Sequence, residues 1–159
     1  MVIMATLDHT NEERAMNQRS IRDVISQRRL VSCTSSQSVR DAAQLMGRDH
    51  VGALPVVDEG RLVGIFTERD ALVRVLAQCR DPKTTLVGEV MTVNPQTIGP
   101  DHPLSHALIR MHDGGFRHMP VVDDGALIGV VSVRDALGPE LTQVSAQMQE
   151  FEYLAEHMR

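Results

Sequence analysis

Aromatic residues are scarce in this chain of 159 residues, where they make up 3% of the sequence, and tryptophan is absent. Proteins bind single-stranded nucleic acids by stacking bases on aromatic side chains, and they bind duplexes through clustered lysines and arginines that neutralise phosphates. A net charge of -5 does not suit the second mode. We therefore expect no nucleic-acid partner.

Cysteines and long apolar runs are scarce as well. Cys33 and Cys79 form no C-x-x-C pair, which is typical of a reduced intracellular protein, and we expect both to be small buried apolar residues rather than redox or zinc ligands. No apolar run is long enough to span a membrane, and the N-terminal segment has acids where a signal peptide would have an apolar core. We therefore expect a cytoplasmic protein with no membrane contact.

An internal repeat is the most informative feature that the sequence does have. Residues 51–72 (VGALPVVDEGRLVGIFTERDAL) return 65 positions later as residues 116–137 (FRHMPVVDDGALIGVVSVRDAL), and 11 of the 22 aligned positions are identical. Each copy has two β-rich runs on either side of an acidic-glycine turn and ends in a Thr/Ser-x-x-Asp motif. The chain therefore contains two copies of one structural unit.

A short β-like stretch and an amphipathic helix precede each copy. The stretches are residues 30–33 and 96–99, and Ser38 and Pro103 are suited to begin the helices. The predicted order of elements is β-α-β-β-α, twice. The apolar residues at helical spacing are Val39, Ala42, Ala43 and Met46 in the first helix, and Leu104, Ala107, Leu108 and Met111 in the second.

The repeats divide the chain into four parts: a polar lead at residues 1–19, the first repeat at 20–80, the second at 81–138 and a tail at 139–159. The tail has apolar residues at alternating spacings of three and four, which predicts an amphipathic helix with a heptad seam. Such a helix is marginal alone, so it packs either on its own repeats or on a second copy or partner. The seam residues are Leu141, Val144, Met148, Phe151, Ala155 and Met158.

Over residues 20–138 the chain resembles a tandem pair of CBS domains, a Bateman module. The resemblance rests on the pattern h-P-V-V-D-x-G (h, hydrophobic) followed by G-h-h-[ST]-x-x-D, present twice in register. It implies an α/β (α+β) fold in which two β-α-β-β-α repeats pack through their sheets as a pseudo-two-fold module with two clefts. It also implies adenine nucleotides or related adenosyl ligands in the clefts, and disc-like homodimers.

The Thr/Ser-x-x-Asp motif has two interpretations. It can be a capping box, in which each side chain satisfies a backbone N–H at the start of a helix. It can also hold a ligand, with the helix start and hydroxyl at a phosphate and the aspartate accepting from ribose hydroxyls. The two are compatible, because a capped helix start can still face an anion.

The resemblance implies that each cleft combines the motif of one repeat with the first strand and the pre-proline residues of the other. The first cleft has a cation, an imidazole and an aromatic ring, so we expect it to bind nucleotide more tightly. The second lacks all three, and we expect it to be weak, empty or selective for a less charged ligand. The first cleft consists of Thr67, Asp70, Thr97, Phe116, Arg117 and His118, and the second of Ser32, Val51, Gly52, Ala53, Ser132 and Asp135.

No catalytic pattern is present: the sequence has no H-E-x-x-H and no P-loop, and no Ser-His-Asp set is evident. His102 and His106 have the i, i+4 spacing of a metal pair and His112 lies nearby, but no further ligand clearly completes a set, so we expect no metal. The regulatory insert of IMP dehydrogenase is similar, but the catalytic barrel of that enzyme needs far more chain than this sequence has.

We therefore expect a non-enzymatic regulatory module that needs no cofactor, forms a homodimer and signals to a protein target in trans. The expected ligand is AMP, ADP or ATP, with S-adenosylmethionine and NAD as alternatives. The competing hypothesis is a ligand-free dimerisation or interaction module, in which the motifs only cap helices. A metal-binding or redox-linked module ranks below both.

Overall fold

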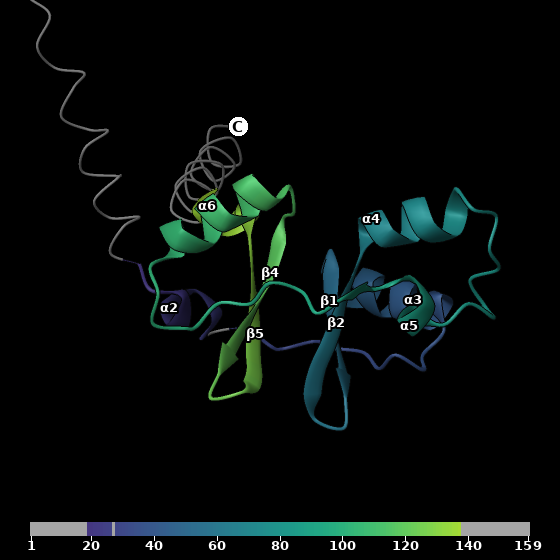
Figure 1. The fold of residues 1–159 in the computed structure, drawn as a ribbon, viewed down its shortest axis with the longest axis horizontal. Coiled ribbons are helices and arrows are strands. Elements are labelled where there is room, and N and C mark those ends of the chain that lie inside the picture. Colours follow the sequence, from purple (N-terminus) through teal and green to yellow (C-terminus); the bar gives the residue numbers. More distant parts are fainter. Residues whose placement is uncertain (1–18, 27, 138–159) are drawn as a thin grey trace, which may run out of the picture.

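Two antiparallel hairpins lie side by side in the middle of the molecule, with helices on the outer side of each (Figure 1). The computed structural model describes residues 19–26 and 28–137. The first hairpin joins β1 (Ala53–Asp58) to β2 (Arg61–Thr67), and the second joins β4 (His118–Asp123) to β5 (Ala126–Ser132). The short β3 (Thr92–Val93) pairs with the free edge of β2. The first sheet therefore contains the hairpin of the first repeat with a short strand from the second, and the other sheet consists of the hairpin of the second repeat.

The hairpin turns form as predicted. Glu59 and Gly60 connect the first pair of strands with φ of 50° and 76°, and Asp124 and Gly125 connect the second with φ of 46° and 80°. Two consecutive residues at positive φ make a turn whose twist matches that of the flanking strands, and a glycine adopts this conformation without steric cost.

The β-like stretches before the helices form single parallel bridges instead of full strands. Cys33 bridges to Val56 of β1, and Ile98 bridges to Val121 of β4. Beyond each bridge the ladder would need an N–H from Pro55 or from its counterpart Pro120, and proline has none. The location of the predicted strands is confirmed, but their predicted extent is wrong.

The two amphipathic helices are α3 (Val39–Asp49) and α6 (Leu104–Gly114). They begin after Ser38 and Pro103, as predicted, and the Ser38 hydroxyl accepts from the amide of Asp41 at 3.1 Å. Most of their predicted apolar residues are buried, but Ala43 is exposed. The motif helices are shorter: α4 (Glu68–Asp70) continues as the π-helical turn η1 (Ala71–Leu76), and η2 (Val133–Leu137) is a 3-10 helix.

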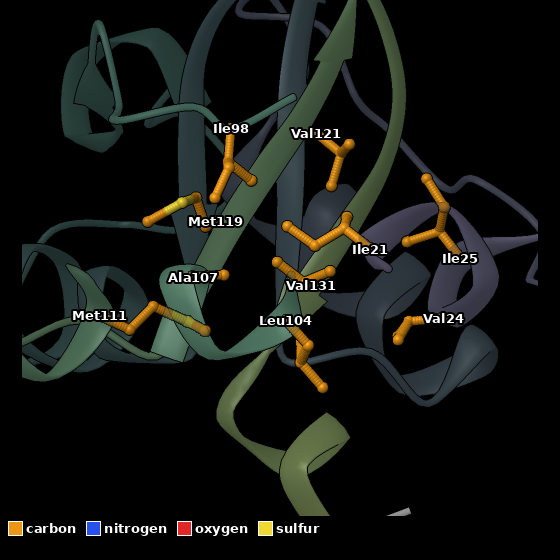
Figure 2. Close-up of a cluster of buried hydrophobic side chains, with 10 residues drawn as sticks. All are labelled: Ile21, Val24, Ile25, Ile98, Leu104, Ala107, Met111, Met119, Val121 and Val131. Atoms are coloured by element: carbon orange, nitrogen blue, oxygen red, sulfur yellow. The ribbon is translucent and has the colours of Figure 1, made fainter. Parts of the chain in front are cut away.

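Two short helices are exchanged between the repeats, so that each packs in the core of the other repeat. The sequence analysis did not predict these helices. The helix α2 (Ile21–Ile25) lies at the start of the first repeat but buries Ile21, Val24 and Ile25 in the core of the second, beside Val121 and Val131 (Figure 2). Likewise, α5 (Val87–Val90) lies near the start of the second repeat but buries its valines in the core of the first. Each core is therefore completed by a helix from the other half of the chain.

The exchange joins the repeats into the predicted pseudo-two-fold module. Backbone bonds at corresponding positions fix both helices: the amide of Ile21 donates to the carbonyl of His102 at 3.0 Å, and the amide of Val87 donates to that of Gln37 at 2.9 Å. Within residues 19–26 and 28–137, no helix is long and apolar enough to cross a membrane. The predicted tail helix lies outside the described residues.

Candidate functional site

The strand ends of the two hairpins meet between the repeats. Ala53, at the start of β1, pairs with Thr67, and His118, at the start of β4, pairs with Ser132. Because β2 and β5 are also in contact across the repeats, the two Thr/Ser-x-x-Asp motifs lie near the pre-proline segments of both halves. Both predicted clefts open at this junction.

The first cleft has a volume of about 800 Å³ and is lined by both repeats. Thr67 and Asp70 come from the first repeat, whereas Phe116, Arg117 and His118 come from the second. The structure thus brings together five of the six residues predicted for this cleft. The further polar residues of the lining are Glu68, Arg69, Arg74, Thr92, Asn94 and Gln96.

The second cleft has a volume of about 590 Å³ and is the pseudo-symmetric counterpart of the first. Val51, Gly52 and Ala53 of the first repeat lie in its wall with Ser132 and Asp135 of the second. Again the structure brings together five of the six predicted residues.

The sixth predicted residue of each cleft is absent from the lining. Gln96 lines the first cleft in place of Thr97, and Val31 lines the second in place of Ser32. Successive side chains of an extended segment lie on opposite faces, so a displacement of one residue moves a side chain away from the cleft. The backbone carbonyl of Thr97 instead accepts from Arg110 Nη1 at 2.9 Å.

The predicted contrast in charge between the clefts is wrong. The second cleft is lined by Arg28, Arg29 and Arg134 together with His50 and His118, so it does not lack a cation or an imidazole. Each cleft is in fact lined by three arginines and two acidic residues. Arg28 and Arg29 lie before the repeated segment and were therefore missed, whereas Arg134 lies inside the second motif and could have been found there.

Both motifs form capping contacts. Asp70 Oδ2 accepts from the amide and the hydroxyl of Thr67 at 2.9 and 2.8 Å, and the amide of Asp70 donates back to that hydroxyl at 3.2 Å. In the second motif Asp135 Oδ2 accepts from the amide and the hydroxyl of Ser132 at 2.6 and 3.3 Å. Both aspartates are buried. In each, one oxygen serves the helix start and the other, Oδ1, makes no hydrogen bond to it.

Comparison with known proteins agrees with this geometry. The family model of the CBS domain matches the chain twice, over residues 21–77 and 87–138. The chain belongs to the CBS-domain family. The two matches correspond to the two repeats, so the chain is a CBS pair.

Relatives of this CBS pair occur in bacteria and plants. The CBS domain-containing protein YhcV of Bacillus subtilis is 34% identical over 80% of this chain and 89% of its own length. The mitochondrial CBS domain-containing protein CBSX3 of Arabidopsis thaliana is 40% identical over 66% of this chain, which spans only 53% of that protein.

Solved structures that resemble this CBS pair include complexes with ligands. A protein with CBS domains from Burkholderia ambifaria superposes with a TM-score of 0.73 at 31% identity, over 78% of this chain and 95% of that one. The protein PAE2072 of Pyrobaculum aerophilum, complexed with AMP, has a TM-score of 0.67 at 26% identity over 74% and 89%. The CBS pair of protein MJ0100, in complex with 5-methylthioadenosine and S-adenosyl-L-methionine, has a TM-score of 0.67 at 29% identity over 82% and 98%.

His118 of this CBS pair lines both clefts, as does Gly52. A Cβ atom on Gly52 would lie 3.2 Å from His118 Nε2 and 3.3 Å from Glu68 Oε2, so a side chain there would crowd the wall between the clefts. Burial, and after it the charge of Arg117, lower the pKa of His118. The imidazole is therefore neutral near pH 7 and can offer one donor and one acceptor.

The two cysteines of the CBS pair differ from each other. Cys33 is buried as predicted, and burial raises the pKa of its thiol to about 11. Cys79 is exposed, so the prediction that it is buried is wrong. The π-helical turn η1 ends at Leu76, and Cys79 follows in an exposed turn with φ of 52°.

His102, just before α6, and His106, on α6, lie close together. The rings of His102 and His106 have centroids 5.9 Å apart. Over residues 19–26 and 28–137, no group of three or more His, Cys, Asp or Glu residues is placed to hold a metal ion.

Proposed function

We propose that this CBS pair is a non-catalytic regulatory module that binds an adenine nucleotide or adenosyl ligand between its repeats and signals the occupancy of its clefts to a protein partner in trans. The observation that carries the proposal is the composition of the clefts. Each places a buried aspartate, whose Oδ2 is held by a capping contact, beside three arginines and apolar surface from the other repeat.

The clefts offer a partner for each part of a mononucleotide. Asp70 Oδ1 in the first cleft makes no capping contact and lies 3.5 Å from Arg74 Nε, a loose ion pair that leaves it able to accept from ribose hydroxyls. Arg117, exposed at the cleft, suits a phosphate through charge-assisted hydrogen bonds. Phe116 and Val73 supply apolar surface for the base. The ligand-bound structures of PAE2072 and MJ0100 show that pairs of this fold take AMP and adenosyl ligands.

A thermal-shift screen with AMP, ADP, ATP, S-adenosylmethionine and NAD tests the proposal. A ligand at one hundred times its Kd stabilises the native state by about 2.7 kcal/mol, which raises the Tm by roughly 5–10 °C for a chain of this size. Asp70→Asn and Asp135→Asn should reduce the shift, and Asp101→Asn, an exposed acid outside both clefts, is the matched control. The absence of a shift with all five ligands would contradict nucleotide binding.

An exposed apolar stripe supports the proposed homodimer. Leu72 and Leu76 follow the first motif and are 58% and 71% exposed. Exposed apolar side chains grouped on one short helix are typical of a surface that a second molecule covers. This surface would also serve the competing hypothesis, in which the clefts stay empty and the module acts only through association.

The solution mass tests the assembly. We expect a homodimer in sedimentation equilibrium, and Leu72→Glu with Leu76→Glu should convert it to a monomer. Ile109→Glu, at an exposed apolar residue of α6, is the control and should leave the dimer intact. A monomeric wild-type chain, or a dimer that persists with both leucine substitutions, would contradict the proposal that this stripe forms the homodimer interface.

A further inference from the structure

The remaining carboxylate oxygen of Asp135 is not free. While Oδ2 serves the capping contact with Ser132, Oδ1 forms an ion pair with Nη2 of Arg28. The side chain of Asp135 is 2% exposed and that of Arg28 is 53% exposed. A buried carboxylate of the second cleft thus holds a half-exposed arginine that lines the same cleft.

The corresponding arginine of the first cleft is anchored elsewhere. Arg74 Nε lies 3.5 Å from Asp70 Oδ1, and Nη1 of Arg74 donates to two backbone carbonyls at the end of α5, at 2.9 and 2.7 Å. Among the residues that the structure describes, the guanidinium of Arg28 has only Asp135 as a partner. Arg28 can therefore leave its carboxylate by breaking one ion pair, whereas Arg74 is fixed to the backbone.

The difference between the clefts is also visible in the sequence. At the repeat spacing of 65 residues, Pro139 stands where the first repeat has Arg74, and Val93 stands opposite Arg28. The second motif thus has no arginine of its own at this position. Its counter-ion comes instead from the first repeat, at Arg28, which follows α2.

Ribose hydroxyls that bind Asp135 compete with Arg28 for Oδ1, because the capping contact already uses Oδ2. An uncharged nucleoside would displace the guanidinium and offer it no new partner. A ribonucleotide carries a phosphate, which a guanidinium binds through charge-assisted and often bidentate hydrogen bonds. The exchange of partners therefore favours a phosphorylated ligand over one without phosphate.

We propose that Arg28 is a specificity-determining residue of the second cleft, which pairs with Asp135 in the empty cleft and with the phosphate of a bound ribonucleotide. The inference rests on the proposed function and names the ligand class of this cleft: phosphorylated ribonucleosides rather than nucleosides or adenosyl ligands without phosphate.

Calorimetric titrations of AMP and of adenosine test this role. The full chain is used with Asp70→Asn, which weakens the first cleft, and the measured quantity is the ratio of the two Kd values. Arg28→Gln should reduce the preference for AMP over adenosine at least tenfold, because AMP loses a charge-assisted contact while adenosine loses a competitor. Arg22→Gln removes the same charge from α2 outside the clefts and should leave the ratio within twofold of its starting value.

The outcomes separate this inference from the proposed function. If AMP binds and Arg28→Gln keeps the original preference, the role of Arg28 is wrong and the proposed function stands. If the wild-type chain binds neither AMP nor adenosine, the proposed function fails and this inference fails with it. If Arg28→Gln does not fold, Arg28→Lys is the deciding variant, because lysine keeps the charge but not the planar guanidinium. Arg28→Lys should reduce the preference for AMP over adenosine about threefold. An unchanged ratio of the two Kd values would overturn the inference.

Discussion

The exchange of short helices predicts that a substitution at the start of the first repeat destabilises the core of the second. Ile21 on α2 is 0% exposed and packs in the core of the second repeat (Figure 2). Ile21→Ala removes three buried carbons, which costs roughly 2.4 kcal/mol at about 0.8 kcal/mol each. The cavity that remains brings the expected loss in the free energy of unfolding to about 3 kcal/mol.

Urea denaturation followed by far-UV circular dichroism measures this loss, and amide hydrogen exchange locates it. We expect faster exchange in β4 and β5, which enclose Ile21, than in the corresponding strands β1 and β2. Leu30→Ala, at a residue 38% exposed and also before α3 of the first repeat, is the control and should cost less than about 1 kcal/mol. A change below about 0.5 kcal/mol for Ile21→Ala, or faster exchange confined to the first repeat, would refute the exchange of helices.

Three further predictions follow from single residues. Gly129→Ala would place a Cβ 2.8 Å from Ile25 Cδ1, and this overpacking should lower the free energy of unfolding by about 1–3 kcal/mol in the same denaturation assay. An unchanged midpoint would mean that α2 does not pack on β5. A thiol reagent at pH 8 should label Cys79 rapidly and Cys33 only on unfolding, because the pKa of Cys33 is raised to about 11, and two fast-reacting thiols per native chain would contradict the burial of Cys33. Because the pKa of His118 is lowered in the folded chain, this side chain is protonated at a higher pH in the unfolded chain than in the folded one. The Tm should therefore fall as the pH drops below the ordinary histidine value of 6.5. His118→Asn should reduce this fall, and an equal fall in the variant would show that other groups cause it.

The elements that local chemistry specifies could be predicted from the sequence. The acidic-glycine turns, the helix starts at Ser38 and Pro103 and the capping contact of Thr67 with Asp70 depend on residues at most a few positions apart. The internal repeat then shows that the same unit occurs twice, and its resemblance to a family supplies the pairing of motif and pre-proline segment across the repeats.

The features that the sequence analysis missed depend on contacts between distant residues. Nothing local shows that Ile21 completes the core of the second repeat, because its partners lie about one hundred positions further along the chain. Arg28 was missed for the same reason, since its partner Asp135 lies far away in the sequence. Gln96 lines the first cleft where Thr97 was predicted because strand register decides which side chain faces the cleft. The segment around them pairs with β4 through one isolated bridge, and the sequence does not specify the register of so short a pairing.

The central claim is that each cleft binds a nucleotide through its motif aspartate. Its most direct test is the stoichiometry of AMP binding in isothermal titration calorimetry, for the wild-type chain and for Asp70→Asn, Asp135→Asn and both together. Asparagine retains an acceptor for the capping contact while losing the charge, so the fold should persist. The account predicts two sites per wild-type chain, the loss of one site or at least a tenfold weakening of it in each single variant, and no binding in the double variant. Two sites of wild-type affinity in the double variant would contradict it.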